Sequence, residues 1–102
     1  MIDWNTAQVE SATAPLELDT LLEQLQLAAV EVFGGSAIVE LLSPLRRNTG
    51  WRARLREFDL AHAHVSGATP TAAAIELARE LLAKRTHGVE AEALRELIKE
   101  AP

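Results

Sequence analysis

The most concentrated chemistry in this sequence is a run of arginines that contains no acid. Residues 46–56 contain five arginines: Arg46, Arg47, Arg52, Arg54 and Arg56. A guanidinium group donates paired hydrogen bonds in a planar fork, and carboxylates and phosphates accept that geometry. The last three arginines stand at alternate positions, and alternate positions of a β-strand project from the same face. The spacing therefore predicts a row of arginines on one sheet face, which the first two extend into a turn.

Three interpretations of this arginine cluster stay open. The first is a contact surface for an acidic protein partner, and the second is contact with a nucleic-acid backbone. The third is a solvated strand face whose arginines cover apolar surface and pair with Glu40, Glu57 or the acidic first helix. Aromatic interleaving, which single-strand binding favours, is limited to Trp51. We predict a partner- or nucleic-acid-binding surface made of Arg46, Arg47, Trp51, Arg52, Arg54 and Arg56.

The histidines and acids form no recognisable catalytic or metal-binding pattern. His62 and His64 stand two residues apart and would share a face if residues 60–65 formed a strand. A metal site needs a third ligand and usually a second shell of supporting groups. Asp59 lies close to these histidines in the sequence, but no glycine-rich phosphate loop, G-x-S-x-G or H-E-x-x-H motif is present. We predict no catalytic residue, no metal and no cofactor, and hence a protein that is not an enzyme.

Length and composition indicate one ordinary globular domain. The chain has 102 residues, of which 48% are apolar and 25% charged, which suffices for a single modest core. There is no cysteine, so disulfides and thiolate chemistry are excluded. No apolar run approaches the roughly 20 residues of a membrane span, and the N-terminus lacks signal-peptide features, so we expect cytoplasmic residence. The net charge is −5, and an acidic chain is repelled by nucleic acid at long range.

Hydrophobic periodicity predicts an α+β fold. We expect a helix over 16–33, strands over 37–42 and 51–55, a hairpin turn over 46–50, and helices over 70–86 and 89–100. Residues 58–65 either continue the second strand or form a third one, and residues 66–68 form a loop.

Local signals mark where the helices begin and end. Gly34-Gly35 ends the first helix, and Thr69-Pro70 caps and opens the second. A capping-box pair of Thr20 and Glu23 alternatively places the start of the first helix near Asp19. The sheet should be antiparallel, with the two C-terminal helices packed on one face and the arginines on the other. Residues 1–15 form an arm, and residues 16–102 form the single domain.

Part of the chain resembles two known families. The segment from Trp51 to Leu82 resembles the strand–loop–helix end of HicB-type antitoxin domains. Gly67, Thr69 and Ala73 match the G-x-T-x-x-E-A-like turn of that family, with Ala72 in place of its acidic residue. Over about residues 37–84 the order of elements is also similar to the double-stranded-RNA-binding fold. Both resemblances imply an α-β-β-β-α domain, and the function they imply is that of a nucleic-acid-binding or antitoxin-like regulator.

Together these observations predict a small non-catalytic binding module of the adaptor or inhibitor type. It would engage a protein partner, or assemble as a homodimer, through the arginine-bearing strand face. Small acidic chains without cysteine are compatible with bacterial or phage accessory proteins. The alternative is the nucleic-acid-binding or antitoxin-like regulator, which would use the same arginines.

Overall fold

A computed structural model describes residues 17–44, 50–58, 60–84 and 87–99 of the chain. The elements follow in the order α2 (Leu18–Phe33), β1 (Ala37–Leu42), β2 (Trp51–Glu57), β3 (Leu60–Gly67), α3 (Pro70–Lys84) and α4 (Val89–Ile98). This order confirms the predicted α+β class and the antiparallel sheet. The predicted arm over 1–15 and most of the predicted turn over 46–50 lie outside the described residues.

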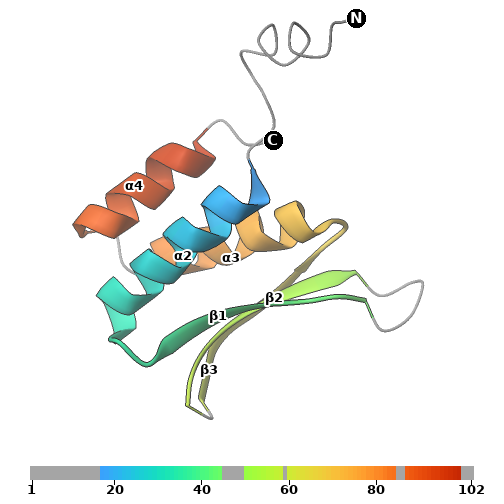
Figure 1. Cartoon of the computed structure of the whole chain (residues 1–102), viewed down its shortest axis with the longest axis horizontal. Helices are drawn as coiled ribbons and strands as arrows, with labels where there is room; N and C mark the ends of the chain where they lie inside the picture. Colours follow the sequence, from blue (N-terminus) through green and yellow to red (C-terminus); the bar gives the residue numbers. More distant parts are fainter. Residues whose placement is uncertain (1–16, 45–49, 59, 85–86, 100–102) are drawn as a thin grey trace, which may run out of the picture.

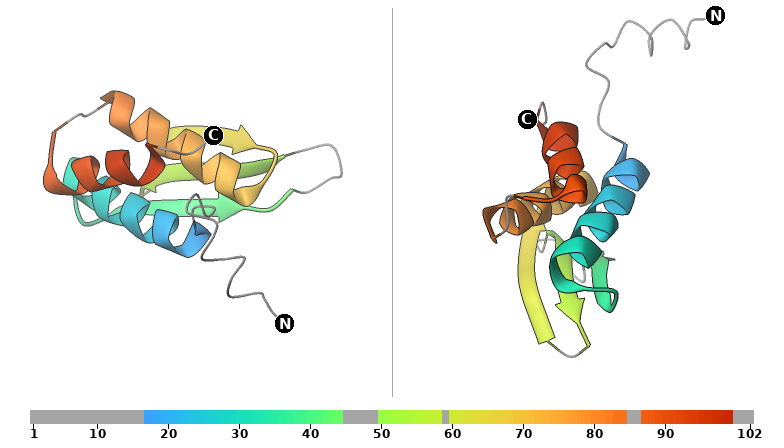
Figure 2. Two further views of the ribbon diagram at one scale, coloured as in Figure 1. Left: turned by 90° about the horizontal axis from the view of Figure 1, so that it is seen from above. Right: turned by 90° about the vertical axis from the view of Figure 1, so that its left-hand side faces the viewer.

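The described elements form three layers (Figures 1 and 2). The sheet has the strand order β1-β2-β3, and both strand pairs are antiparallel. Helices α2 and α3 cover one face of this sheet, with α2 over β1 and α3 over β2 and β3. Helix α4 packs on α2 and α3, on the side away from the sheet. All three helices therefore lie on one side of the sheet.

The core lies between the sheet and the α2–α3 layer, extends between these helices and α4, and is almost purely aliphatic. Its largest fully buried side chains are Leu21, Leu25, Leu55, Leu77, Leu81 and Leu94. Small residues let the backbones approach, and Ala53 of β2, Ala28 of α2 and Ala74 of α3 are all completely buried. No buried residue of the described part is polar or charged. Burial of leucine and alanine surface is thus the main force that holds the helices on the sheet.

The helix boundaries follow the predicted signals in part. Helix α2 ends at Phe33, and Gly34 follows with a φ of 111°, a conformation that glycine adopts without strain. Thr69 caps α3, since its Oγ1 accepts a hydrogen bond of 3.0 Å from Ala72 N. Helix α2 begins at Leu18, so the alternative start near Asp19 is confirmed, but Thr20 does not cap the helix, because the N-cap is Glu17.

Two glycines bring β3, β2 and α3 into close contact. Residues 66–67 were expected in a loop, but they belong to β3, which pairs with β2 as far as Gly67. A Cβ at Gly67 would lie 2.5 Å from Ala73 N, and a Cβ at Gly50 would lie 2.6 Å from Gly67 O. The strand therefore continues to the start of α3 because its last residue has no side chain to clash with the helix.

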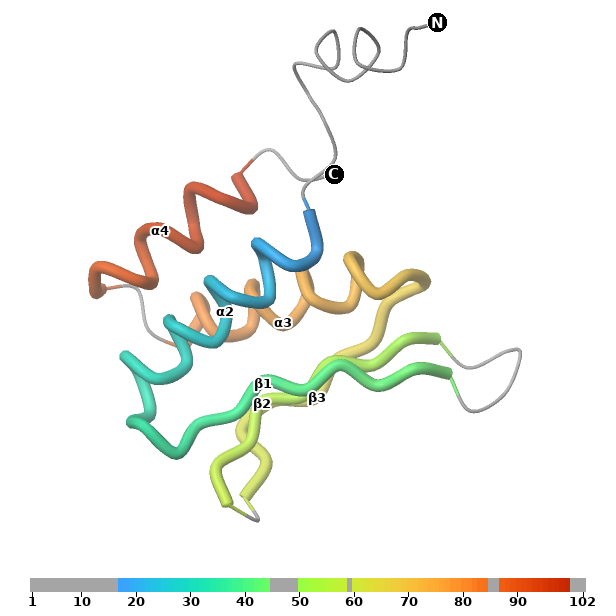
Figure 3. The backbone as a smooth tube through the Cα atoms, viewed as in Figure 1, coloured from blue at the N-terminus to red at the C-terminus, as the bar shows by residue number. Residues whose placement is uncertain are grey.

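The tube in Figure 3 shows the strong twist of the sheet, whose β2–β3 tip lies at the opposite end from the C-terminal end of β1. None of the helices in the described ranges is long and apolar enough to cross a membrane.

Candidate interaction surface

The sheet face without helices carries nine side chains in three cross-strand rows. We call this the open face; its rows are Leu42–Arg52–Ser66, Glu40–Arg54–His64 and Ile38–Arg56–Ala61. The three arginines form its central column, as the alternation of β2 predicts, whereas Ala53 and Leu55 between them are buried under the helices. With three arginines and one glutamate, the open face carries two net positive charges on a chain whose overall charge is −5.

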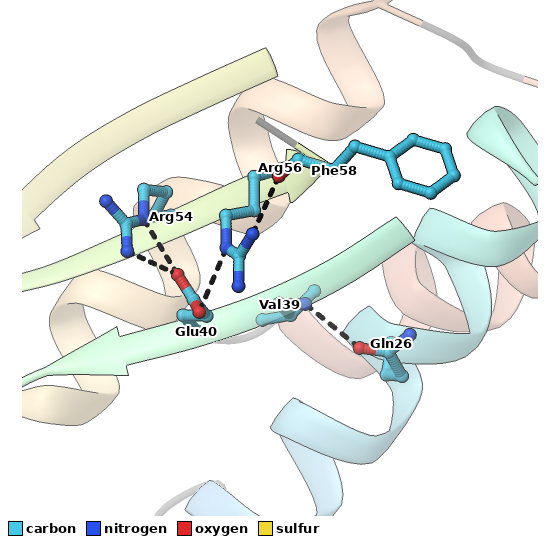
Figure 4. Close-up of polar contacts among 6 residues, drawn as sticks. All are labelled: Gln26, Val39, Glu40, Arg54, Arg56 and Phe58. Carbon is cyan, nitrogen blue, oxygen red and sulfur yellow. Dashed lines mark hydrogen bonds and ion pairs between the residues drawn. The ribbon is translucent and has the colours of Figure 1, made fainter. Parts of the chain in front are cut away.

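Glu40 neutralises part of this charge by lying between two arginines (Figure 4). Arg54 directs two nitrogens at Oε1 of Glu40, with Nε at 2.8 Å and Nη2 at 2.6 Å. Arg56 Nε lies 3.0 Å from Oε2, but it is out of line for a hydrogen bond, so this contact is an ion pair by distance alone. The Arg54 hydrogen bonds, and after them Arg56, hold the pKa of Glu40 below its ordinary value. The predicted pairing with Glu40 is thus observed.

Arg52 differs from its two neighbours, because within the described ranges it makes no ion pair or hydrogen bond. Its cross-strand neighbour on β1 is Leu42, where Arg54 has Glu40. Its neighbour on β3 is Ser66, which is exposed. One guanidinium of the open face therefore has an apolar residue on one side and a hydroxyl on the other.

The open face ends at an exposed apolar tip. Phe58 follows β2 in a left-handed backbone conformation with a φ of 55°, which costs a non-glycine residue about 1 kcal/mol. Arg56 Nη1 donates a 2.7 Å hydrogen bond to the carbonyl oxygen of Phe58 and holds the tip in place (Figure 4). The Phe58 side chain is 73% exposed, and Leu60 across the tip is 61% exposed. Phe58 was not among the predicted site residues, and the available signal was an aromatic residue two positions after Arg56.

The two histidines of β3 lie on opposite faces of the sheet. Leu55 pairs with Ala63 and Arg56 with Ala61, so His62 is an extra residue in β3, a β-bulge. Its ring stacks on Phe33 of α2 with the centroids 4.2 Å apart. His64 instead pairs in register with Arg54 on the open face. The expectation that the histidines share a face is therefore wrong, because the bulge shifts the alternation by one residue.

Glu57 belongs to the His62 side of the sheet and takes no part in the open face. Its Oε2 accepts a 2.8 Å hydrogen bond from Ser36 Oγ, and its Oε1 lies 3.4 Å from His62 Nε2. The Ser36 hydrogen bond, and after it His62, lowers the pKa of Glu57. Within the described ranges no group of three or more His, Asp and Glu side chains could hold a metal ion.

The remaining predicted site residues are not part of the observed surface. Trp51 lies on the helix-covered face, partly buried and packed against the core. Arg46 and Arg47 lie outside the described residues. The open face adds six residues to the three predicted arginines: Ile38, Glu40, Leu42, Ala61, His64 and Ser66. Ser66 was missed because it was expected in a loop.

The free edge of β1 is partly closed by a side chain of α2. Gln26 Nε2 donates a 2.8 Å hydrogen bond to Ala37 O. Gln26 Oε1 accepts a 3.0 Å hydrogen bond from Val39 N (Figure 4). The amide thus takes the place of a neighbouring strand and protects the start of β1 from pairing with another chain. This end of the edge is therefore not free to pair with another strand.

No family model, no curated protein and no solved structure matches the chain. The resemblance of residues 37–84 to HicB-type antitoxin and double-stranded-RNA-binding domains therefore stays a prediction.

Proposed function

We propose that the chain is a non-catalytic binding module that engages a protein partner through the open face. The observation that carries this proposal is the uneven use of the arginines. Arg54 and Arg56 hold Glu40, whereas Arg52 has no partner within the described residues. A guanidinium on an otherwise structured sheet face is pre-organised to bind, since the flanking strands fix its backbone.

Charge favours a protein over nucleic acid as this partner. Binding to a nucleic-acid backbone gains affinity from several phosphates, each neutralised by a free cation. On the open face an internal carboxylate already occupies two of the three arginines. Two identical faces of net positive charge would also repel one another, so a different protein is a better occupant than a second copy.

The proposal is tested by capture from a lysate of the native host, with and without nuclease treatment. We compare the wild type with an Arg52→Ala/Arg54→Ala variant and with a Lys84→Ala/Lys99→Ala control. The control loses the same charge at two exposed positions away from the open face, the last residue of α3 and the residue that follows α4. We expect one protein that the wild type and the control capture in both lysates and that the arginine variant loses. Arg-dependent capture that disappears with nuclease would instead support the nucleic-acid-binding alternative.

A further inference from the structure

We propose that the open face recognises an acidic segment of its partner, one carboxylate of which binds Arg52 and Ser66. This inference rests on the proposed function and specifies the chemistry of the partner. It follows from a comparison of two adjacent rows of the open face, one of which contains its own carboxylate and one of which does not.

The row with its own carboxylate shows what the face binds. Glu40 projects from β1 directly beside Arg54 of β2, and two nitrogens of that arginine lie within 2.8 Å of one carboxylate oxygen. The same carboxylate reaches Arg56 through its second oxygen. An acid on the β1 side of the arginine column is therefore well placed to receive guanidinium hydrogen bonds.

The adjacent row has the same geometry but lacks the acid. Leu42 stands beside Arg52 in the register that Glu40 has beside Arg54, and leucine offers no acceptor. On the other side of Arg52, Ser66 supplies a hydroxyl. Directly opposed residues of antiparallel strands have Cβ atoms about 4.5–5.5 Å apart, so both side chains can donate to one carboxylate. A carboxylate from outside the chain would complete this row as Glu40 completes the next.

The surroundings favour an acidic peptide segment as the source of this carboxylate. Leu42 and Ile38 border the arginine column on β1, and Ile38 is 42% exposed, so apolar side chains of the segment would find contacts there. The net positive charge of the face would attract acidic residues that flank the bound one.

A substitution within the same row can supply the carboxylate that would bind Arg52 from the chain itself. Leu42→Glu places a carboxylate beside Arg52 in the position that Glu40 has beside Arg54. We expect this variant to fold, since it would gain an ion pair on a partly exposed face, and to compete with the partner. Leu42→Gln has the same shape without the charge and serves as the matched control.

The direct test is an NMR titration of the ¹⁵N-labelled full chain with an acetylated octapeptide of alternating Glu and Ala. A Gln–Ala octapeptide and a short single-stranded oligonucleotide serve as the neutral and the phosphate probes. We expect the Glu peptide to shift the amides of Arg52 and Ser66. Arg52→Ala and Leu42→Glu should weaken its binding about tenfold, the loss of roughly one charge-assisted hydrogen bond, and Leu42→Gln should not.

The amide spectra also report folding, so a variant that does not fold is recognised before its binding is interpreted. Equal shifts with the Gln peptide, or binding that Leu42→Glu leaves unchanged, would overturn the inference. Stronger binding of the oligonucleotide at Arg52 would do the same and would assign the site to phosphate.

Adding the Glu peptide to the lysate capture separates this inference from the proposed function. If the peptide releases the protein whose capture the Arg52→Ala/Arg54→Ala variant loses, both are supported. If excess peptide does not release the captured protein, the proposed function stands, but the inference that the partner binds through an acidic segment is contradicted. Peptide binding at Arg52 without any Arg-dependent capture supports the site and contradicts the proposed function.

Discussion

The two faces of the three-stranded sheet differ in function, because alternate residues of β2 project from opposite faces. Ala53 and Leu55 project into the helices and are almost completely buried, whereas Arg52, Arg54 and Arg56 project from the other face. On the covered face the fully buried side chains are all apolar and serve packing. On the open face two arginines serve an internal ion-pair cluster, and one is left without a described partner.

This difference separates stability from binding along a single strand. Apolar burial on the covered face is worth several kcal/mol per large side chain, whereas partly exposed ion pairs contribute little. A substitution on β2 should therefore affect either the free energy of unfolding or the affinity for a partner, depending on whether its position is odd or even. Substitutions on the two faces test this division.

The largest expected effect is that of Leu55→Ala on the covered face. Leu55 is 1% exposed, and its truncation leaves a cavity beneath the helices. We expect a loss of about 2–5 kcal/mol in the free energy of unfolding, measured by urea denaturation. Arg52→Ala, on the open face of the same strand, should change that free energy by no more than about 0.5 kcal/mol. Similar losses for both variants would contradict the division between the two faces.

Gly67→Ala should destabilise the covered face without a loss of buried surface. The new methyl group would lie 2.5 Å from Ala73 N and 2.7 Å from Ala72 C, so β3 and the start of α3 must separate. We expect a loss of about 1–3 kcal/mol, as for other over-packed positions. Gly35→Ala is the control, since a methyl group there meets no atom within 4 Å. Equal stabilities of the two variants would show that the strand-to-helix approach is looser than described.

Glu31→Ala tests a polar contact within the helix layers. The Glu31 carboxylate on α2 accepts hydrogen bonds from Glu90 N and Ala91 N at 3.0–3.1 Å and so caps the N-terminus of α4. We expect a loss of about 1 kcal/mol, the usual effect of a lost helix cap, and faster hydrogen exchange confined to α4. Glu23→Ala, at an exposed position of the same helix, should leave α4 exchange unchanged. Unchanged hydrogen exchange of α4 in Glu31→Ala would show that Glu31 does not stabilise the N-terminus of α4.

The elements with strong local signals were predictable from the sequence. Leucine spacing gave α2, the Thr69-Pro70 start gave α3, and the alternation of β2 gave the arginine column. These features depend only on residues that are neighbours along the chain or one helical turn apart.

The features that depend on pairing between distant segments were not predictable. The bulge at His62 arises from the register of β3 against β2, and no local residue type announces it. The register of β1 against β2 likewise decides which arginine lies beside an acid. A shift of two residues would place Glu40 opposite Arg52 instead of Arg54. The cap on α4 joins positions 31 and 90–91, and the sequence between them sets no such distance.

The smallest effect concerns two carboxyls, Glu40 on the open face and Glu57 on the His62 side of the sheet. Both have a pKa lowered from the ordinary value of 4.5, Glu40 chiefly by Arg54 and Glu57 chiefly by the Ser36 hydroxyl. Because each pKa is lower in the folded state, the unfolded chain binds more protons as the pH falls below about 4.5. The contribution of each carboxyl to stability is therefore complete above that pH and is lost as the pH falls through the folded-state pKa.

Salt should distinguish these two carboxyls. We expect Glu40→Gln and Glu57→Gln each to flatten the loss of stability below pH 4.5, measured by thermal unfolding at several pH values. About 0.5 M NaCl screens charge pairs at a surface but not a short hydrogen bond to a neutral hydroxyl. Salt should thus reduce the contribution of Glu40 to the pH-dependent stability more than it reduces the contribution of Glu57. If salt changes both contributions equally, the pKa of Glu40 does not depend on its arginines in solution. The row of Arg54 would then have no bound carboxylate with which to compare the row of Arg52.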